Sequence, residues 1–120
     1  MPQIDVQSPP FAPITDYANA YGSKAFLCQC EDENGNPVTP LTFRWTLSDD
    51  QGNVINGRQD VSASPASPVV VVLSGDDLGL LPFDDYVRVL NMFWTYDSTY
   101  GPNMSGAGVY LFGIQPGAAT

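Results

Sequence analysis

The alternation of apolar and polar residues is clearest over residues 41–48. The odd positions of this segment are apolar: Leu41, Phe43, Trp45 and Leu47. The even positions carry Thr, Arg and Ser side chains. Because successive side chains of a β-strand point to opposite faces of a sheet, the pattern predicts a strand with one buried and one solvated face.

Other short apolar segments, separated by turn residues, predict further strands. Residues 23–31 place Phe26, Cys28 and Cys30 on one face and lead into an Asn-Gly turn. Residues 69–73 form a β-branched run between turn residues, which predicts a strand buried on both faces. A capping pattern at Ser74 and a proline at position 82 leave room for one helical turn at residues 74–81. The chain is therefore predicted to be an all-β, antiparallel sandwich of about seven strands.

An extended arm is predicted for residues 1–22, ahead of a single β-sandwich domain at residues 23–120. Four prolines in the arm block a helix and interrupt any regular ladder. Between them stand the side chains with which the arm would bind a neighbouring molecule: Phe11, Ile14, Tyr17 and Tyr21. An irregular first edge strand with a loose terminus is the alternative for the same residues.

The last two predicted strands, residues 87–96 and 109–114, are apolar on both faces. A sandwich strand is normally polar on its outer face. The pattern therefore indicates either a bulge near residues 90–91 that switches the side-chain parity, or an outer face that binds a partner. The candidate partner-binding residues of this region are aromatic: Phe93, Trp94, Tyr96, Tyr100, Tyr110 and Phe112.

Charge and composition narrow the range of functions. Thirteen acidic and four basic residues give a net charge of -9, which repels nucleic-acid phosphates and anionic lipid headgroups. The sequence has no histidine, so the usual general base and the commonest metal ligand are missing. We therefore expect a protein that is not an enzyme, holds no metal or cofactor, and binds neither nucleic acid nor a membrane.

Acidic and thiol groups have structural explanations in this sequence. The paired aspartates at 49–50, 76–77 and 84–85 fall in turns or before a helix or strand, where aspartate is favoured. The acidic segment 31–36 begins like a calcium loop, but its glycine comes too early and no closing glutamate follows, so a plain turn is favoured. Cys28 and Cys30 share one strand face, which disfavours a disulfide between them and predicts free, buried thiols.

Three features together resemble an immunoglobulin-like sandwich: an inward-facing Trp45 on the third strand, the helical turn at 74–81, and Tyr86 after two aspartates at the start of the sixth strand. In the disulfide-linked members a cysteine follows that tyrosine by two residues. This chain has Arg88 there, so it is more similar to the disulfide-free domains. The segments 42–52, 84–89 and 94–97 resemble small immunoglobulin-like virion proteins of tailed phages, such as capsid decoration, head-fibre and tail adaptor proteins.

The phage resemblance implies a structural protein of a virion, made in the host cytoplasm. Its partners would be the major capsid protein or other virion proteins, and it would form a homo-oligomer or a multi-copy assembly. The alternative is a glycan-binding or adhesion module with a stacking platform of aromatic and polar side chains: Trp94, Tyr96, Asp97, Tyr100 and Asn103. The sequence begins without a basic and apolar leader, and no apolar run is long enough to cross a bilayer, so no targeting or membrane segment is expected.

Overall fold

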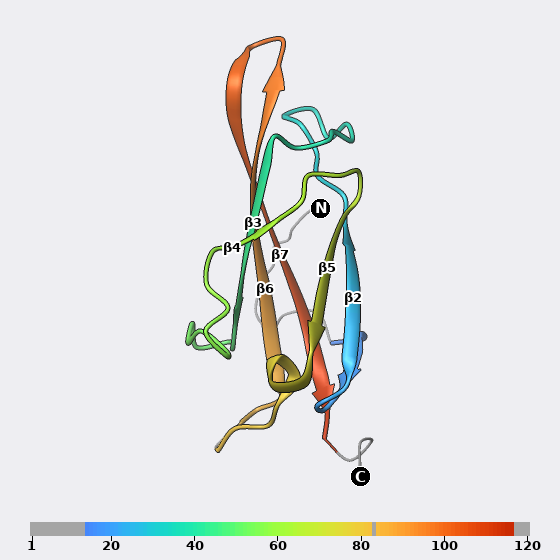
Figure 1. The fold of residues 1–120 in the computed structure, drawn as a ribbon, viewed down its shortest axis with the longest axis vertical. Helices are drawn as coiled ribbons and strands as arrows, with labels where there is room; N and C mark the ends of the chain where they lie inside the picture. Colours follow the sequence, from blue (N-terminus) through green and yellow to red (C-terminus); the bar gives the residue numbers. More distant parts are fainter. Residues whose placement is uncertain (1–13, 83, 117–120) are drawn as a thin grey trace.

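The computed structural model describes residues 14–82 and 84–116, and these form seven β-strands and a short 3-10 helix. The strands are β1 (Tyr17–Asn19), β2 (Ser23–Cys28), β3 (Thr42–Ser48), β4 (Val61–Ala63), β5 (Val69–Ser74), β6 (Val87–Ser98) and β7 (Gly101–Gln115); the 3-10 helix η2 spans Gly75–Leu78. One sheet has the order β1-β7-β6-β3-β4, and β2 pairs with β5 in the other (Figure 1). The predicted all-β class and the short helical turn are confirmed.

A hydrophobic core lies between the two sheets. Strand β3 contributes Phe43, Trp45 and Leu47, which are all buried. Strand β2 contributes Phe26 and Cys28 from the opposite sheet. The alternation of apolar and polar residues therefore predicted the buried face of β3 correctly, because one side of the five-stranded sheet packs on the core. Leu41, which the same pattern placed on this face, precedes the strand and is 45% exposed, so its predicted burial is wrong.

Strand β5 differs from its prediction. Val69, Val71 and Leu73 are buried, but Val70 and Val72 are 51% and 57% exposed. One face of the two-stranded sheet packs on the core, whereas no described strand or helix covers the other. A β-branched run looks the same in the sequence whether one or both faces are covered, so the prediction of a strand buried on both faces is wrong.

Part of the predicted arm belongs to the larger sheet. Strand β1 pairs in parallel with the end of β7, where Tyr17 lies beside Gly113. The Tyr17 ring covers this glycine so closely that a Cβ atom there would lie 2.5 Å from the ring. Ala18, the next residue of β1, points into the core. Phe11, which was predicted to bind a neighbour through the arm, lies outside the described residues.

Strands β6 and β7 form a long antiparallel hairpin whose tip extends beyond the other strands (Figure 1). Its pairing is regular through Leu90, opposite Tyr110, and Asn91, opposite Val109. The ladder shifts only further on, between Tyr96 and Ser98. The alternative of a parity switch at residues 90–91 is therefore wrong, and the even-numbered residues of both strands face the same side throughout this part of the hairpin.

A buried ion pair fixes the base of the hairpin. The Arg88 side chain is fully buried on β6, and its Nη1 and Nη2 atoms donate to the Asp84 carboxylate at 2.8 and 2.6 Å. Nη2 also donates to the carbonyl oxygen of Gly79 at 3.0 Å. The hydrogen bonds from Arg88 hold the pKa of Asp84 below its usual value. This pair ties β6 to the loop that follows η2.

Candidate protein-binding surfaces

The outer face of the five-stranded sheet carries an apolar row along the hairpin. We call its members the outer apolar surface: Tyr17, Val89, Phe93, Val109 and Leu111. Val89 lies opposite Leu111 across the two strands, so their side chains are neighbours on this face. Four of the five are more than a third exposed, with Val109 at 62%. The row has one polar member, since Asn91 lies on the same face opposite Val109, and an exposed apolar row of this kind is typical of a protein-binding site.

Polar groups border the outer apolar surface on the side of β3. The Arg44 guanidinium lies 5.8 Å from the centre of the Phe93 ring and also pairs with Asp60 at 3.1 Å. The hydroxyls of Thr42 and Thr95 are 2.8 Å apart on the same face. An apolar centre with a polar rim that includes an arginine resembles the composition of protein interfaces.

The outer face of the two-stranded sheet is a second exposed apolar region. We call its members the ribbon surface: Ala25, Leu27, Val70 and Val72. Ala25 pairs with Val72 and Leu27 pairs with Val70, so all four side chains lie on one face. The two sheets pack through their inner faces, and the ribbon surface and the outer apolar surface therefore lie on opposite sides of the molecule.

Several aromatic residues proposed as binding residues from the sequence point inward. Phe112 is fully buried and its ring lies 5.0 Å from that of Phe26. The ring of Trp94 stacks with Phe43 at 6.4 Å, and its Nε1 donates to the carbonyl oxygen of Glu31 at 3.2 Å. Tyr96 is 4% exposed. Phe112 and Tyr96 therefore belong to the interior, and Trp94 connects β6 to the loop after β2.

The remaining aromatic candidates lie far apart in the fold. The Tyr21 hydroxyl accepts a hydrogen bond from the Leu80 amide, beside η2. Tyr100 is at the tip of the hairpin and is 76% exposed. Since Trp94 and Tyr96 face inward, the stacking platform of the glycan alternative is not assembled on one surface. Because both faces of β6 are apolar, sequence periodicity could not predict which face packs on the core and which is exposed.

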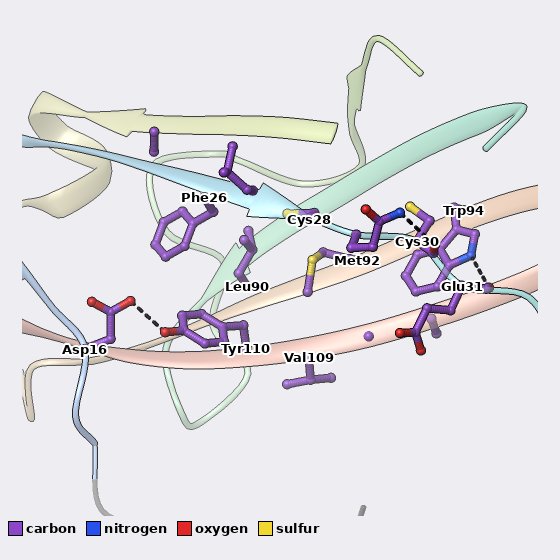
Figure 2. Close-up of a pocket in the computed structure, with 15 residues that line it drawn as sticks. Asp16, Phe26, Cys28, Cys30, Glu31, Leu90, Met92, Trp94, Val109 and Tyr110 are labelled. Atoms are coloured by element: carbon purple, nitrogen blue, oxygen red, sulfur yellow. Dashed lines mark hydrogen bonds between the residues drawn. The ribbon is translucent and has the colours of Figure 1, made fainter. Parts of the chain in front are cut away.

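A groove opens along the side of the molecule between β2 and β7 (Figure 2). Its volume is about 550 Å³, and its floor is formed by apolar side chains from both sheets: Phe26, Cys28, Leu90, Met92 and Trp94. Cys28 and Cys30 are free thiols along this groove. Burial and, to a smaller extent, the neighbouring Cys28 thiol raise the pKa of Cys30 to about 11. At neutral pH the Cys30 thiol is therefore protonated and a poor nucleophile.

An ionic bridge closes one end of the groove. The Asp16 carboxylate accepts a hydrogen bond from the Tyr110 hydroxyl at 2.6 Å and pairs with Lys24 at 2.8 Å (Figure 2). Hydrogen bonds from Lys24 and Tyr110 lower the pKa of Asp16, and the bond to Asp16 raises the pKa of Tyr110 to about 12. This bridge was not predicted, although Lys24 is the single lysine of the sequence and the nearby acidic residues limit its possible partners.

The acidic segments form turns. One Asp32 carboxylate oxygen accepts the amides of Asn34 and Asn36, each at 2.9 Å, which confirms the predicted plain turn. Asp50 and Asp85 come from different predicted pairs, and the neighbouring Asp85 carboxyl group raises the pKa of Asp50, because a proton on Asp50 can be shared with it. Within residues 14–82 and 84–116, no group of three or more His, Cys, Asp or Glu side chains is arranged to hold a metal ion.

The described part of the chain contains no helix that is long and apolar enough to span a membrane. Comparison with protein-family models, with curated proteins and with solved structures gives no match to this chain.

Proposed function

We propose that this chain is a structural protein of a tailed-phage virion, a capsid decoration or adaptor protein that binds other virion proteins and has no enzymatic activity. The single observation that carries the proposal is the presence of apolar surfaces on both outer faces, the outer apolar surface and the ribbon surface. Contiguous exposed apolar rows mark protein-binding sites. Two such rows on opposite sides allow one molecule to contact two neighbours, as a cement or adaptor protein must.

We further propose that the fold is a disulfide-free immunoglobulin-like sandwich. Two sheets with Trp45 in the shared core and a 3-10 turn before the long hairpin support this assignment. Tyr86 departs from the resemblance, because it is 42% exposed and has a left-handed backbone with φ of 64°. Arg88 stands where the resemblance would place a disulfide cysteine. Its buried ion pair with Asp84 would take the place of the disulfide, because it attaches the base of the hairpin to the rest of the domain.

Charge supports a position on the outside of the particle. A net charge of -9 is repelled by packaged DNA and is compatible with the outer surface of a capsid or with a tail. The acidic side chains of the described residues lie largely in the turns. Neighbouring copies could therefore contact each other through the apolar sheet faces without bringing these negative charges together.

Particle association tests the proposal. The chain is expressed in the producing host with two aspartates placed on the outer apolar surface (Val109→Asp with Leu111→Asp), and particles are purified by density-gradient sedimentation. The control places the same two charges at polar positions of the same sheet face (Ser62→Asp with Ser105→Asp). We expect the wild type and the control to sediment with particles at one fixed stoichiometry, and the Val109 and Leu111 variant to remain folded and unbound.

Two results would contradict the proposal. One is a wild-type chain that is absent from purified particles. The other is full incorporation of the Val109→Asp and Leu111→Asp variant, which would show that the outer apolar surface is not used. Binding to a glycan array without any particle association would favour the adhesion alternative.

A further inference from the structure

The groove between β2 and β7 lies between two strand edges that have no partner in residues 14–82 and 84–116. Strand β2 pairs with β5 on one side alone. Strand β7 pairs with β6 along its length, and β1 covers its other edge only at residues 113–115. An uncovered edge presents free amide and carbonyl groups that can pair with a further strand.

The groove has the length of one short strand. One end, on the left in Figure 2, is closed by Asp16, which bonds to Tyr110 and pairs with Lys24, and the other by the hydrogen bond between Trp94 and Glu31. Residues 24–31 lie between these closures and span about 23 Å when extended. A strand of about seven residues would therefore occupy most of the groove.

The beginning of the chain has the sequence pattern of such a strand. Residues 2–8 read Pro-Gln-Ile-Asp-Val-Gln-Ser, in which Ile4 and Val6 alternate with Gln3, Asp5 and Gln7. A strand with this period has one apolar and one polar face. Residues 9 and 10 are both proline and end the segment. The segment is about 20 Å long when extended, which is close to the length of the groove.

The path of the described chain favours exchange between two copies. Ile14, the first described residue, contacts Gly113 together with Tyr17 on the outer face of β7. The groove and the core lie on the opposite face of the sheet from Ile14, since Ala18 and Phe112, which alternate with Tyr17 and Gly113 along their strands, are buried there. The chain thus leaves the edge of β7 on the side away from its own groove, and the proline-rich residues 9–13 lie between this point and the strand-like segment.

We propose that residues 2–8 of one copy add to the free edge of β2 in a second copy, with Ile4 and Val6 directed into the groove. A two-stranded sheet is marginal in water, and a third strand would stabilise it and supply backbone partners for β2. Ile4 and Val6 would contact the apolar floor at Phe26, Cys28 and Met92. The inference deepens the proposed assembly function, since it specifies a second copy of the chain as one partner.

The test uses purified full-length protein, so its outcome does not depend on virion association. Ile4→Asp with Val6→Asp places two charges on the apolar face of the segment, and Gln3→Asp with Gln7→Asp places the same charges on its polar face. Sedimentation velocity gives the oligomeric state, and hydrogen exchange gives the protection of the β2 amides. We expect the wild type and the Gln variant to associate, and the Ile4 and Val6 variant to dissociate with an affinity loss of about tenfold or more.

Protection of the β2 edge separates the possible outcomes. In the associated protein the β2 amides that face the groove should exchange about tenfold or more slowly than in the Ile4 and Val6 variant. A synthetic peptide of residues 1–9 added to that variant should restore the protection. A monomeric wild type in which Ile4 and Val6 still protect β2 would mean that the segment occupies its own groove, and it would overturn exchange between copies. Equal exchange in all three proteins would overturn the groove as a strand-binding site.

Discussion

Replacing Asp84 with asparagine tests the role of the buried ion pair at the base of the hairpin. The change keeps the shape of the side chain and removes its charge, so the fully buried Arg88 guanidinium loses its counterion. Arg88 Nε has no hydrogen-bond partner, and the other acceptors of this guanidinium are the neutral carbonyl oxygens of Val87 and Gly79, which cannot balance its charge. The Asp84 carboxylate also accepts the amides of Leu81 and Tyr86, and the asparagine retains one oxygen for both.

The expected loss of stability is large compared with that of a surface pair. Removing one partner of a buried ion pair costs about 3–5 kcal/mol, because an unpaired charge remains in the interior. The pair of Arg44 and Asp60 is the control, since its side chains are 52% and 54% exposed. For Asp60→Asn we expect a loss of about 1 kcal/mol or less. A domain with a total stability of about 5–15 kcal/mol would tolerate the second change easily and the first only narrowly.

Urea denaturation followed by tryptophan fluorescence measures both changes. Because the pKa of Asp84 is lowered in the fold, its contribution is present above the unfolded value of about 3.9 and is lost as the pH falls through the folded value. Asp84→Asn should therefore flatten the acid limb of stability against pH. Adding Arg88→Met to Asp84→Asn should recover about 1 kcal/mol or more, since no charge is then left buried. Equal losses for Asp84→Asn and Asp60→Asn, or strictly additive losses at positions 84 and 88, would refute this account.

Two further predictions follow from the hairpin. Gly106→Ala should lower the free energy of unfolding by about 1–3 kcal/mol, because its Cβ would lie 2.2 Å from the indole nitrogen of Trp94. Gly108→Ala, whose nearest neighbours would be 3.5 Å away, should be almost neutral in the same denaturation assay; equal effects would contradict the packing argument. The raised pKa of Tyr110 predicts that its bond to Asp16 stabilises the fold fully below pH 10 and is lost as the pH rises to about 12. Thermal melts of the wild type and Tyr110→Phe should therefore converge over this range, and a constant difference between them would argue against the bond.

The sequence was most informative where one face of a strand is covered and the other is wet. Strand β3 is such a case, and its core residues were predicted individually. In β6 the residues of both parities are apolar, so periodicity could not identify Trp94 and Tyr96 as inward-facing side chains. Their orientation depends on the register with β3, where Trp94 lies opposite Phe43, and no local pattern encodes that register.

The groove could not be predicted from local patterns, because it exists only where neighbouring strands fail to cover the edges of β2 and β7 along their full length. Strand β1 covers the edge of β7 for three residues, and no described strand adjoins the outer edge of β2. The buried Arg88 did leave a signal, since a single arginine stands between valines in a strand four residues after Asp84. Spacing of this kind in an apolar strand predicts a buried pair more directly than it predicts a solvated charge.

The position of β7 between several neighbours limits how its sequence can vary. In most strands of a two-sheet protein every second side chain faces solvent, and these positions tolerate substitution. In β7 Phe112 is buried in the core and Tyr110 lines the groove, whereas Val109 and Leu111 belong to the outer apolar surface. Gly106 and Gly113 lie beneath the rings of Trp94 and Tyr17 and admit no larger side chain. Natural variants of this protein should therefore change least along β7 and most in the exposed turns around β4, where a substitution affects a single short strand.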